Sequence, residues 1–302
     1  MTSGPLQLDN LLETQTPIVA PGTFNALFAR LIEEQGFPAV YLSGAGVANS
    51  LLGKPDLGLV SMEEMVMIAR LVCDVVTIPV IADGDTGYGG VHNVARVVSA
   101  YESSGVAAIQ LEDQVFPKRC GHFDGKEVVS VGEMLERLAA ANEARSNTKG
   151  DGIRIIARTD AAGPLGLGDA IRRARIYGEA GADLLFVEAP TSRDELEAIG
   201  KELSEWPLVA NMVEGGKTPL LSVDELAELG FSLILFPGII TRAVTGAARS
   251  LLRELAEAGS TQGMIDDMAT FDEVNDLVGL GEADQWERSI SKETSHRAEA
   301  DS

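Results

Sequence analysis

Eight short apolar runs with the composition of buried strands recur along the 302-residue chain, and an amphipathic stretch separates each run from the next. In these stretches the apolar residues recur at intervals of three and four, which is the spacing of a helix face. The runs are residues 17–21, 39–43, 79–83, 107–113, 154–160, 183–189, 207–212 and 232–237. This alternation predicts parallel strands joined by helices, and eight such units predict a closed (β/α)8 barrel, the TIM barrel, rather than two open sheets.

The boundaries follow from the same pattern. We expect one domain over residues 1–302, with the barrel at about 17–258 and a helical extension at about 259–290. The extension is expected to pack on a neighbouring subunit. The last residues, 291–302, read SKETSHRAEADS. They are polar throughout, so we expect a disordered tail.

Composition excludes several classes of partner. The chain has 24 basic and 46 acidic residues and a net charge of −22, which opposes binding to nucleic acid or to an anionic membrane. No apolar run of about 18 residues and no secretion signal are found, so we expect a cytoplasmic protein that acts on small molecules. An acid-rich surface suits a high-salt cytoplasm, but it is equally compatible with an ordinary acidic surface.

Polar side chains stand where many of the runs end. The carboxyl ends of the strands form the active-site face of such a barrel. The polar residues at these ends include Ser43, Asp83, Asp85, Glu112, Asp113, Arg158, Asp160, Glu188 and Asn211. Asp113 and Asp160 have a simpler explanation as helix caps or partners of arginines. Even so, so many acids at one rim require cations or a metal ion to offset their repulsion.

The segment IADGDTGYGG favours a metal ion. It places Asp83 and Asp85 two residues apart at a strand end, and Glu112 ends the next run. An all-oxygen site of this kind suits Mg²⁺, with Mn²⁺ as the alternative, and such ions keep several waters. A glycine-rich phosphate loop is the competing interpretation, but no Walker lysine follows.

The segment DQVFPKRCGH places Lys118, Cys120 and His122 on the loop after the fourth run, which is long enough to cover the barrel mouth. Cationic neighbours make a thiol more acidic, so we expect Cys120 to exchange a proton near neutral pH, as an acid or as a nucleophile. The other cysteine, Cys73, lies in a helical run. Two cysteines give neither a disulfide framework nor a four-ligand zinc site.

Five segments carry a family resemblance. SGAGVANSLLGKPDLG, DGDTGYG, LEDQVFPKRCGH, ARTDA and NMVEGGKTP are similar, in the same order, to the motifs of the isocitrate lyase and phosphoenolpyruvate mutase superfamily. The resemblance covers residues from about 17 to 255, and the KRCGH form resembles the short-chain lyases of the 2-methylisocitrate lyase type. It implies a Mg²⁺-dependent barrel and a homotetramer that exchanges C-terminal helices between subunits.

The resemblance also implies roles for individual residues. Mg²⁺ would bind Asp83, with Asp56, Asp85 and Glu112 acting largely through water. The backbone at Ser43, Gly44, Ala45 and Gly121 would hold the 2-hydroxy or 2-oxo acid, and Arg158 would clamp its carboxylate with two hydrogen bonds. Tyr41 would remove the hydroxyl proton, and Cys120 would protonate the departing fragment beside Lys118. Glu188, Asn211 and His122 would organise the second half of the substrate.

The implied reaction is retro-aldol cleavage of a 2-hydroxy polycarboxylate, with 2-methylisocitrate giving pyruvate and succinate. Val213 stands where the methylisocitrate and isocitrate enzymes carry a hydroxyl residue, so 2,3-dimethylmalate lyase and oxaloacetate hydrolase activities remain alternatives. For a tricarboxylate substrate, Lys217 or Arg242 would supply the missing contact. A phosphonate mutase is disfavoured because those relatives generally lack the cysteine. A phosphoryl-transfer or hydrolytic enzyme and a non-catalytic barrel also remain open, since fold alone does not decide the reaction.

Overall fold

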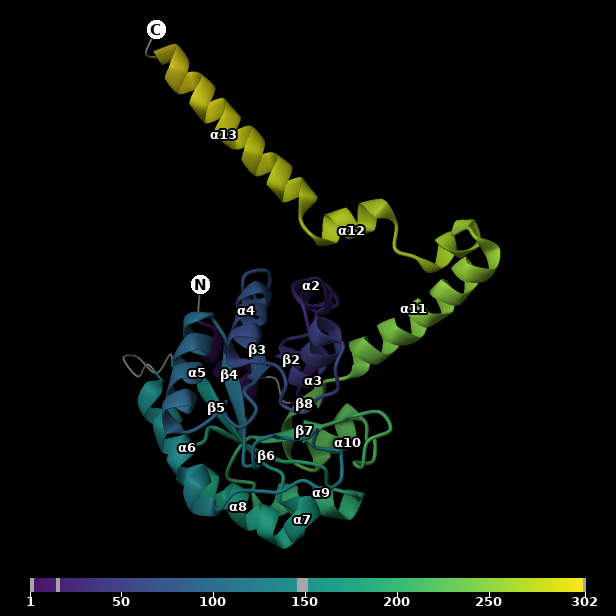
Figure 1. Ribbon diagram of the computed structural model, residues 1–302. Coiled ribbons are helices and arrows are strands. Elements are labelled where there is room, and N and C mark those ends of the chain that lie inside the picture. The colour runs from purple at the N-terminus through teal and green to yellow at the C-terminus, as the bar shows by residue number, and fades with distance from the viewer. Residues whose placement is uncertain (1–2, 15–16, 146–151, 301–302) are drawn as a thin grey trace. The chain divides into compact units, whose positions relative to one another are not determined.

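The computed structural model describes residues 3–14, 17–145 and 152–300. In the first of two compact units, Met1–Ala243, eight parallel strands close into a barrel in chain order (Figure 1). The strands are β1 Ile18–Thr23, β2 Val40–Leu42, β3 Val80–Asp83, β4 Ala108–Glu112, β5 Arg154–Thr159, β6 Leu184–Val187, β7 Leu208–Asn211 and β8 Phe231–Phe236. Each of the eight apolar runs overlaps one strand, so the (β/α)8 prediction is confirmed.

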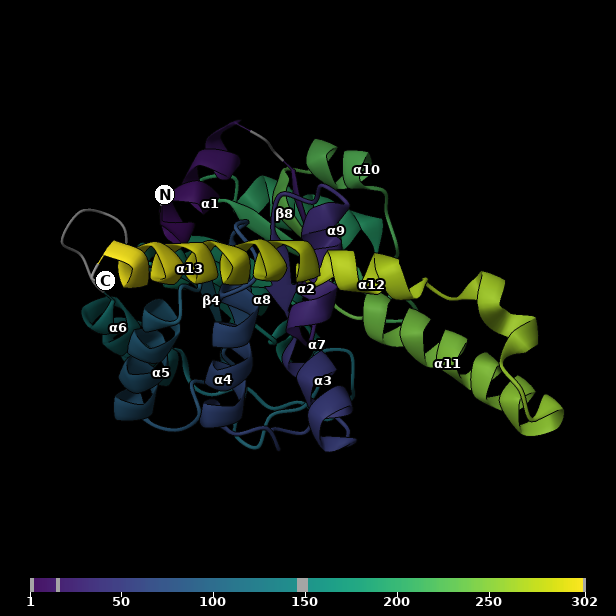
Figure 2. The ribbon, with the colours of Figure 1, turned by 90° about the horizontal axis from the view of Figure 1, so that it is seen from above.

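Helices cover the outside of this barrel, and α4, α5 and α6 lie next to one another along one side of it (Figure 2). The helical elements of this unit are α1 Gly4–Thr14, α2 Ala26–Glu34, α3 Gly44–Val47, η1 Ala48–Leu52, α4 Met62–Cys73, α5 Val91–Ser103, α6 Val131–Ala144, α7 Ala162–Leu165, α8 Leu167–Glu179, α9 Arg193–Glu202, α10 Val223–Glu228 and the start of α11 Ile239–Ala258. Serines 61, 130, 192 and 222 cap α4, α6, α9 and α10. Each accepts a hydrogen bond from a first-turn amide, so these helices begin at a serine.

The core of the first unit has two layers. One cluster packs the outward faces of the strands against the helices and includes the buried Met65, Tyr101 and Leu138. The second cluster fills the barrel interior and includes Ile81, Ile156, Phe186 and Leu235. A filled interior confines any ligand site to the ends of the barrel.

Helix α1 belongs to the interior cluster, although no helix was expected at residues 4–14. Its Leu8 is fully buried among the inward-facing strand residues, with Leu11 and Leu12 packed alongside. Asp9 forms an ion pair with Arg154, the first residue of β5. Because Arg154 begins its strand, α1 closes the amino-terminal end of the barrel. The spacing of Leu8, Leu11 and Leu12 is helical and was the available signal.

The second unit, Val244–Ser302, contains the rest of α11, then η2 Gln262–Asp267, α12 Phe271–Leu277 and α13 Leu280–Ala300. The unit boundary therefore lies within α11 rather than after it. Residues 291–300, for which disorder was expected, form the end of α13, while 301–302 lie outside the described residues. Polarity alone does not prevent a helix, and this segment contains neither glycine nor proline. Nowhere in the described ranges does a helix have the length and apolarity to span a membrane.

Candidate active site

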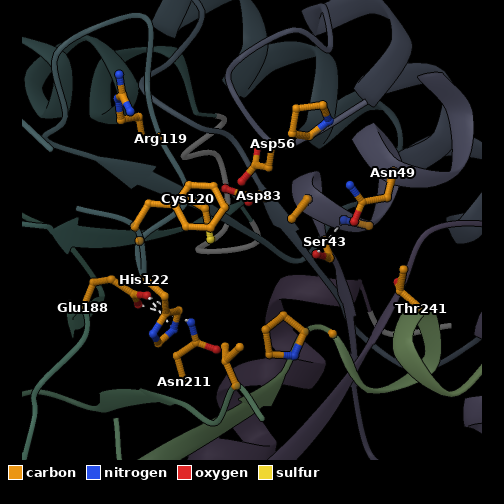
Figure 3. Close-up of a pocket in the computed structure, with 18 of the residues that line it drawn as sticks. Ser43, Asn49, Asp56, Asp83, Arg119, Cys120, His122, Glu188, Asn211 and Thr241 are labelled. Atoms are coloured by element: carbon orange, nitrogen blue, oxygen red, sulfur yellow. Dashed lines mark hydrogen bonds and ion pairs between the residues drawn. The ribbon is translucent and has the colours of Figure 1, made fainter. Parts of the chain in front are cut away.

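A cavity of about 290 Å³ lies at the carboxyl ends of the strands (Figure 3). Its walls come from the strand ends, the loop after β4 and the start of α11. Most of the residues that the sequence singled out line it: Tyr41, Ser43, Ala45, Asp56, Asp83, Lys118, Cys120, Gly121, His122, Arg158, Glu188 and Asn211. Gly44, Asp85 and Glu112 do not line the cavity. Segments far apart in the chain thus meet as the barrel topology requires.

Asp83 is held at the end of β3 by local and neighbouring groups. Its Oδ1 accepts hydrogen bonds from the Asp85 amide and from Gln110 Nε2, both at 3.3 Å. A Cβ on Gly44 would lie 2.9 Å from Asp83 Oδ2, so a larger residue at position 44 would collide with this carboxylate. Tyr101 also donates to the Asp83 carbonyl at 2.8 Å. These contacts fix the orientation of the Asp83 carboxylate beside the cavity.

Burial disfavours the ionised forms of two neighbouring acids, Asp85 and Glu112. Burial raises the pKa of Asp85 to about 6, although Lys118 partly opposes the effect. Burial also raises the pKa of Glu112 well above its usual value, and Glu112 Oε1 finds no hydrogen-bond partner within the described part of the chain. A divalent cation would relieve both effects because it favours the ionised forms.

The carboxylates around the cavity suit a metal ion that keeps several bound waters, rather than one held entirely by protein ligands. The carboxylates that interact around this rim outnumber its cations: Asp56, Asp83, Asp85, Glu112, Asp160 and Glu188 face Lys118, Lys126 and Arg158. Over the described ranges, no three His, Cys, Asp or Glu side chains converge as direct ligands of one ion. Mg²⁺ commonly uses one or two carboxylates and keeps several waters, so the two observations agree.

Lys118 is buried among the acids rather than beside the cysteine. Its Nζ lies 2.5 Å from Asp56 Oδ1 and 2.7 Å from Asp85 Oδ1, and its side chain is 4% exposed. Burial alone would lower the pKa of Lys118, but Asp85 and Asp56 outweigh it and raise that pKa well above the usual value. Lys118 is therefore a fixed cation that links the loop after β4 to Asp56 and Asp85, two of the expected metal ligands.

The expectation of an acidified Cys120 thiol is wrong in this structure. Burial raises the pKa of Cys120, and Asp56 and Glu188 add to that effect. Its cationic neighbours in sequence do not compensate, because Lys118 pairs with carboxylates and burial lowers the pKa of His122, which favours the neutral imidazole. A thiol that keeps its proton is a proton donor rather than a ready nucleophile.

His122, Glu188 and Asn211 form one contact group, in which Glu188 lies within ion-pair distance of His122 and accepts hydrogen bonds from Asn211 (Figure 3). His122 Nδ1 accepts from the Lys217 amide at 3.0 Å, which places the proton of the neutral ring on Nε2, 3.2 Å from Glu188 Oε1. Asn211 Nδ2 donates to both Glu188 oxygens, at 3.3 and 3.2 Å. The sequence placed these three residues together correctly.

Arg158 has a different bidentate partner from the one expected. Its Nε and Nη2 donate to Asp160 at 2.9 and 3.1 Å, while Nη1 lies 3.4 Å from Glu112 Oε2. Burial opposes the ionisation of Asp160, but Arg158 and Lys126 prevail and lower its pKa to about 2. Asp160 thus occupies the fork that we assigned to a substrate carboxylate, and the Glu112-facing edge of Arg158 is the one less tightly engaged.

Two further assignments change in detail. The Ser43 amide donates to the Thr23 carbonyl at 3.0 Å, extending the β1–β2 pairing, so this amide is not free for a substrate. The Gly44 and Ala45 amides lie in the first turn of α3, where amides lack intrahelical acceptors. Burial, with the charge of Asp83, raises the pKa of Tyr41 well above its usual value. Tyr41 therefore keeps its proton in this surrounding of acids.

Several cavity residues were missed as site residues. They include Asn49, Pro55, Phe123 and Thr241, and Arg242 was considered only as a substitute contact. Thr241 and Arg242 belong to the start of α11, and Arg242 Nη1 lies 3.7 Å from Glu214 Oε2. The signal was available, because α11 directly follows the carboxyl end of β8.

A (β/α)8 barrel whose mouth gathers an acid cluster, a buried lysine, a paired arginine and a protonated thiol has the features of a barrel enzyme. The sequence profile of the family described as phosphoenolpyruvate phosphomutase matches residues 8–256. The chain belongs to the phosphoenolpyruvate mutase and isocitrate lyase superfamily.

Relatives named as lyases match almost the whole chain. The chain is 44% identical to a 2,3-dimethylmalate lyase of Eubacterium barkeri, over 91% of this chain and 93% of the relative. It is 42% identical to a 2-methylisocitrate lyase of Aeropyrum pernix, over 95% and 91%. Among solved structures, oxaloacetate acetylhydrolase with 3,3-difluorooxalacetate superposes with a TM-score of 0.91 at 38% identity, covering 96% of this chain and 97% of that one. The match supports the recognition made from the five motifs.

Proposed function

We propose that the protein is a Mg²⁺-dependent carbon–carbon lyase that cleaves 2-methylisocitrate to pyruvate and succinate by a retro-aldol reaction. The observation that carries the proposal is that the Cys120 thiol lines the same cavity as Asp83 and Arg158. A retro-aldol cleavage needs a group that takes the hydroxyl proton as the carbonyl forms and a proton donor for the departing carbon, which receives the electron pair of the broken bond. The cavity supplies residues suited to both tasks.

The metal part of the proposal rests on the acid cluster. Asp83 would bind Mg²⁺ directly, and Asp56, Asp85 and Glu112 would act through water, with Mn²⁺ as an alternative ion. When bound, the ion stabilises the negative charge of the 2-oxo acid fragment. A bound cation would also favour the ionised form of Glu112, which burial opposes.

The residues of the chain then divide the remaining work. The Gly44 and Ala45 amides and the Nη1 edge of Arg158 bind the 2-hydroxy acid end, while His122, Glu188 and Asn211 orient the other half. Tyr41 is the candidate base for the hydroxyl proton. Nearby acids oppose its ionisation, and a cation beside Asp83 favours it. As the bond breaks, its electrons move to the departing dicarboxylate carbon, which takes the Cys120 proton.

Replacement of Cys120 tests the acid assignment. Cys120→Ser should lower turnover by at least about a hundredfold, because a serine hydroxyl is a much weaker acid, and should leave Mg²⁺-dependent pyruvate binding within about threefold. Turnover is measured by coupled detection of pyruvate, and binding by calorimetry. Cys73→Ser is the matched control, since Cys73 ends α4 outside the cavity. Unchanged turnover in Cys120→Ser would exclude the proposed role.

A specific observation favours a second substrate. Val213 lines the cavity where a hydroxyl contact to a third carboxylate was expected, and the 2,3-dimethylmalate lyase relative is 44% identical. The candidates separate in one assay with Mg²⁺ on 2-methylisocitrate, 2,3-dimethylmalate, isocitrate and oxaloacetate. Pyruvate from 2-methylisocitrate but not from 2,3-dimethylmalate supports the first proposal, and the reverse result supports the second.

The proposal includes a homotetramer in the cytoplasm that exchanges its C-terminal helices. Large apolar side chains are exposed on the single chain in the second unit, among them Leu252, Phe271 and Trp286, at 65%, 83% and 68%. Apolar side chains of this size gain free energy when a neighbouring subunit covers them. Native mass spectrometry of the full chain measures the subunit number, and a monomer would contradict this part of the proposal.

A further inference from the structure

Lys126 is a buried lysine that the proposed chemistry does not use. It follows the Cys120–Gly121–His122 segment by a few residues, and its side chain is 3% exposed. Its Nζ donates to the Gly121 carbonyl at 2.5 Å and to Asp160 Oδ1 at 2.8 Å. Burying a lysine is costly unless its ammonium is paired, so a buried lysine with two such acceptors indicates a defined role for its position.

The two acceptors belong to different parts of the molecule. Gly121 lies on the loop that carries Cys120. Asp160 directly follows β5 and accepts hydrogen bonds from Nε and Nη2 of Arg158. The single ammonium of Lys126 therefore connects the cysteine loop to the arginine of the cavity. A compact ammonium with three donors suits two acceptors that point to one place.

The backbone packing at Gly121 shows how closely the loop is seated. A Cβ on Gly121 would lie 2.3 Å from Glu188 Oε1 and 2.4 Å from Arg158 Nη2. The loop thus lies directly on two of the cavity's charged side chains. A second contact between loops joins Lys217 to Asp124 at 2.5 Å, but the Asp124 side chain is 95% exposed, where ion pairs contribute little.

We propose that Lys126 is a positioning residue for the lyase reaction: by bridging the Gly121 carbonyl and Asp160, its ammonium holds Cys120 over the cavity. The inference rests on the proposed function for its effect on turnover, but the position of the loop can be measured without any substrate. Lys126→Met is the informative change, because it keeps most of the volume and removes the charge. Asp160 keeps Arg158 as its partner in that variant.

The first measurement is the rate of Cys120 alkylation by iodoacetamide, followed by mass spectrometry of the peptide that contains it. A released loop exposes the thiol and removes the burial that raises its pKa, so alkylation in Lys126→Met should accelerate at least tenfold. Lys201→Met makes the same chemical change on the exposed surface of α9 and should leave the rate unchanged. Gly121→Ala, which lifts the loop directly, should reproduce the acceleration.

The second measurement separates positioning from general damage. Lys126→Met should lower kcat at least tenfold, while calorimetric pyruvate affinity with Mg²⁺ stays within about threefold. An alkylation rate within twofold of the original in folded Lys126→Met would overturn the proposal. If Lys126→Met fails to fold, Lys126→Gln replaces it, and failure of both would also overturn it, because Lys126 would then be a folding residue. Absence of lyase activity in the unaltered chain would instead refute the proposed function and leave the alkylation result valid.

Discussion

At the scale of single residues, burial decides what each side chain can do. Cys120 stands next to an arginine in sequence, yet partial burial raises the pKa of its thiol, and the nearby Asp56 and Glu188 add to that effect. Lys118 stands two residues earlier, and its charge is directed to Asp56 and Asp85. Their proximity in the chain therefore predicted a lowered pKa for the Cys120 thiol, whereas the structure raises it. The same proximity placed both residues at the cavity correctly.

Asp85 makes a residue-scale prediction about pH. Its pKa is about 6 in the folded protein against 3.8 for an ordinary aspartate, so the folded state takes up this proton first as the pH falls. In the presence of a chelator, lowering the pH from 7 to 5 should therefore raise the unfolding free energy more in the original chain than in Asp85→Asn, by about 1 kcal/mol. Urea denaturation at both pH values measures the difference. Equal changes in the two proteins would contradict the assignment.

Among the secondary-structure elements, α1 was not expected from the sequence. It contributes to stability through the one face that packs into the barrel interior. Leu8 is fully buried in the barrel interior cluster, whereas Leu6 on the same helix is 37% exposed. Leu8→Ala should lower the unfolding free energy by about 2–4 kcal/mol, because it removes packed methyl groups and leaves a cavity.

Leu6→Ala is the matched control for this helix and should cost less than about 1 kcal/mol. Urea denaturation of both variants provides the comparison. Equal losses would show that α1 does not close the barrel through Leu8.

At the scale of the whole molecule, the net charge of −22 opposes compactness. Raising NaCl from about 20 to 300 mM screens this repulsion and should raise Tm by on the order of 3–5 °C. A scanning calorimetry series measures it, and a falling Tm would show that specific ion pairs outweigh the general repulsion. Full activity in molar KCl would favour a high-salt habitat over an ordinary acidic surface.

Local sequence patterns were enough to predict the barrel and the residues that lie at the carboxyl ends of its strands. Strand and helix periods are local, and parallel strands of a closed barrel bring their carboxyl ends together, so Asp83, Glu112, Arg158 and Glu188 meet without further information.

The interaction partners and protonation states of these side chains depend on the folded arrangement. Lys126 meets Asp160 across 34 residues, and Asp160 in turn occupies Arg158. The Lys126–Asp160 contact and the pKa of Cys120 depend on burial and on neighbours from other segments, which no local pattern encodes, whereas an arginine partner for Asp160 was among the expectations from the sequence.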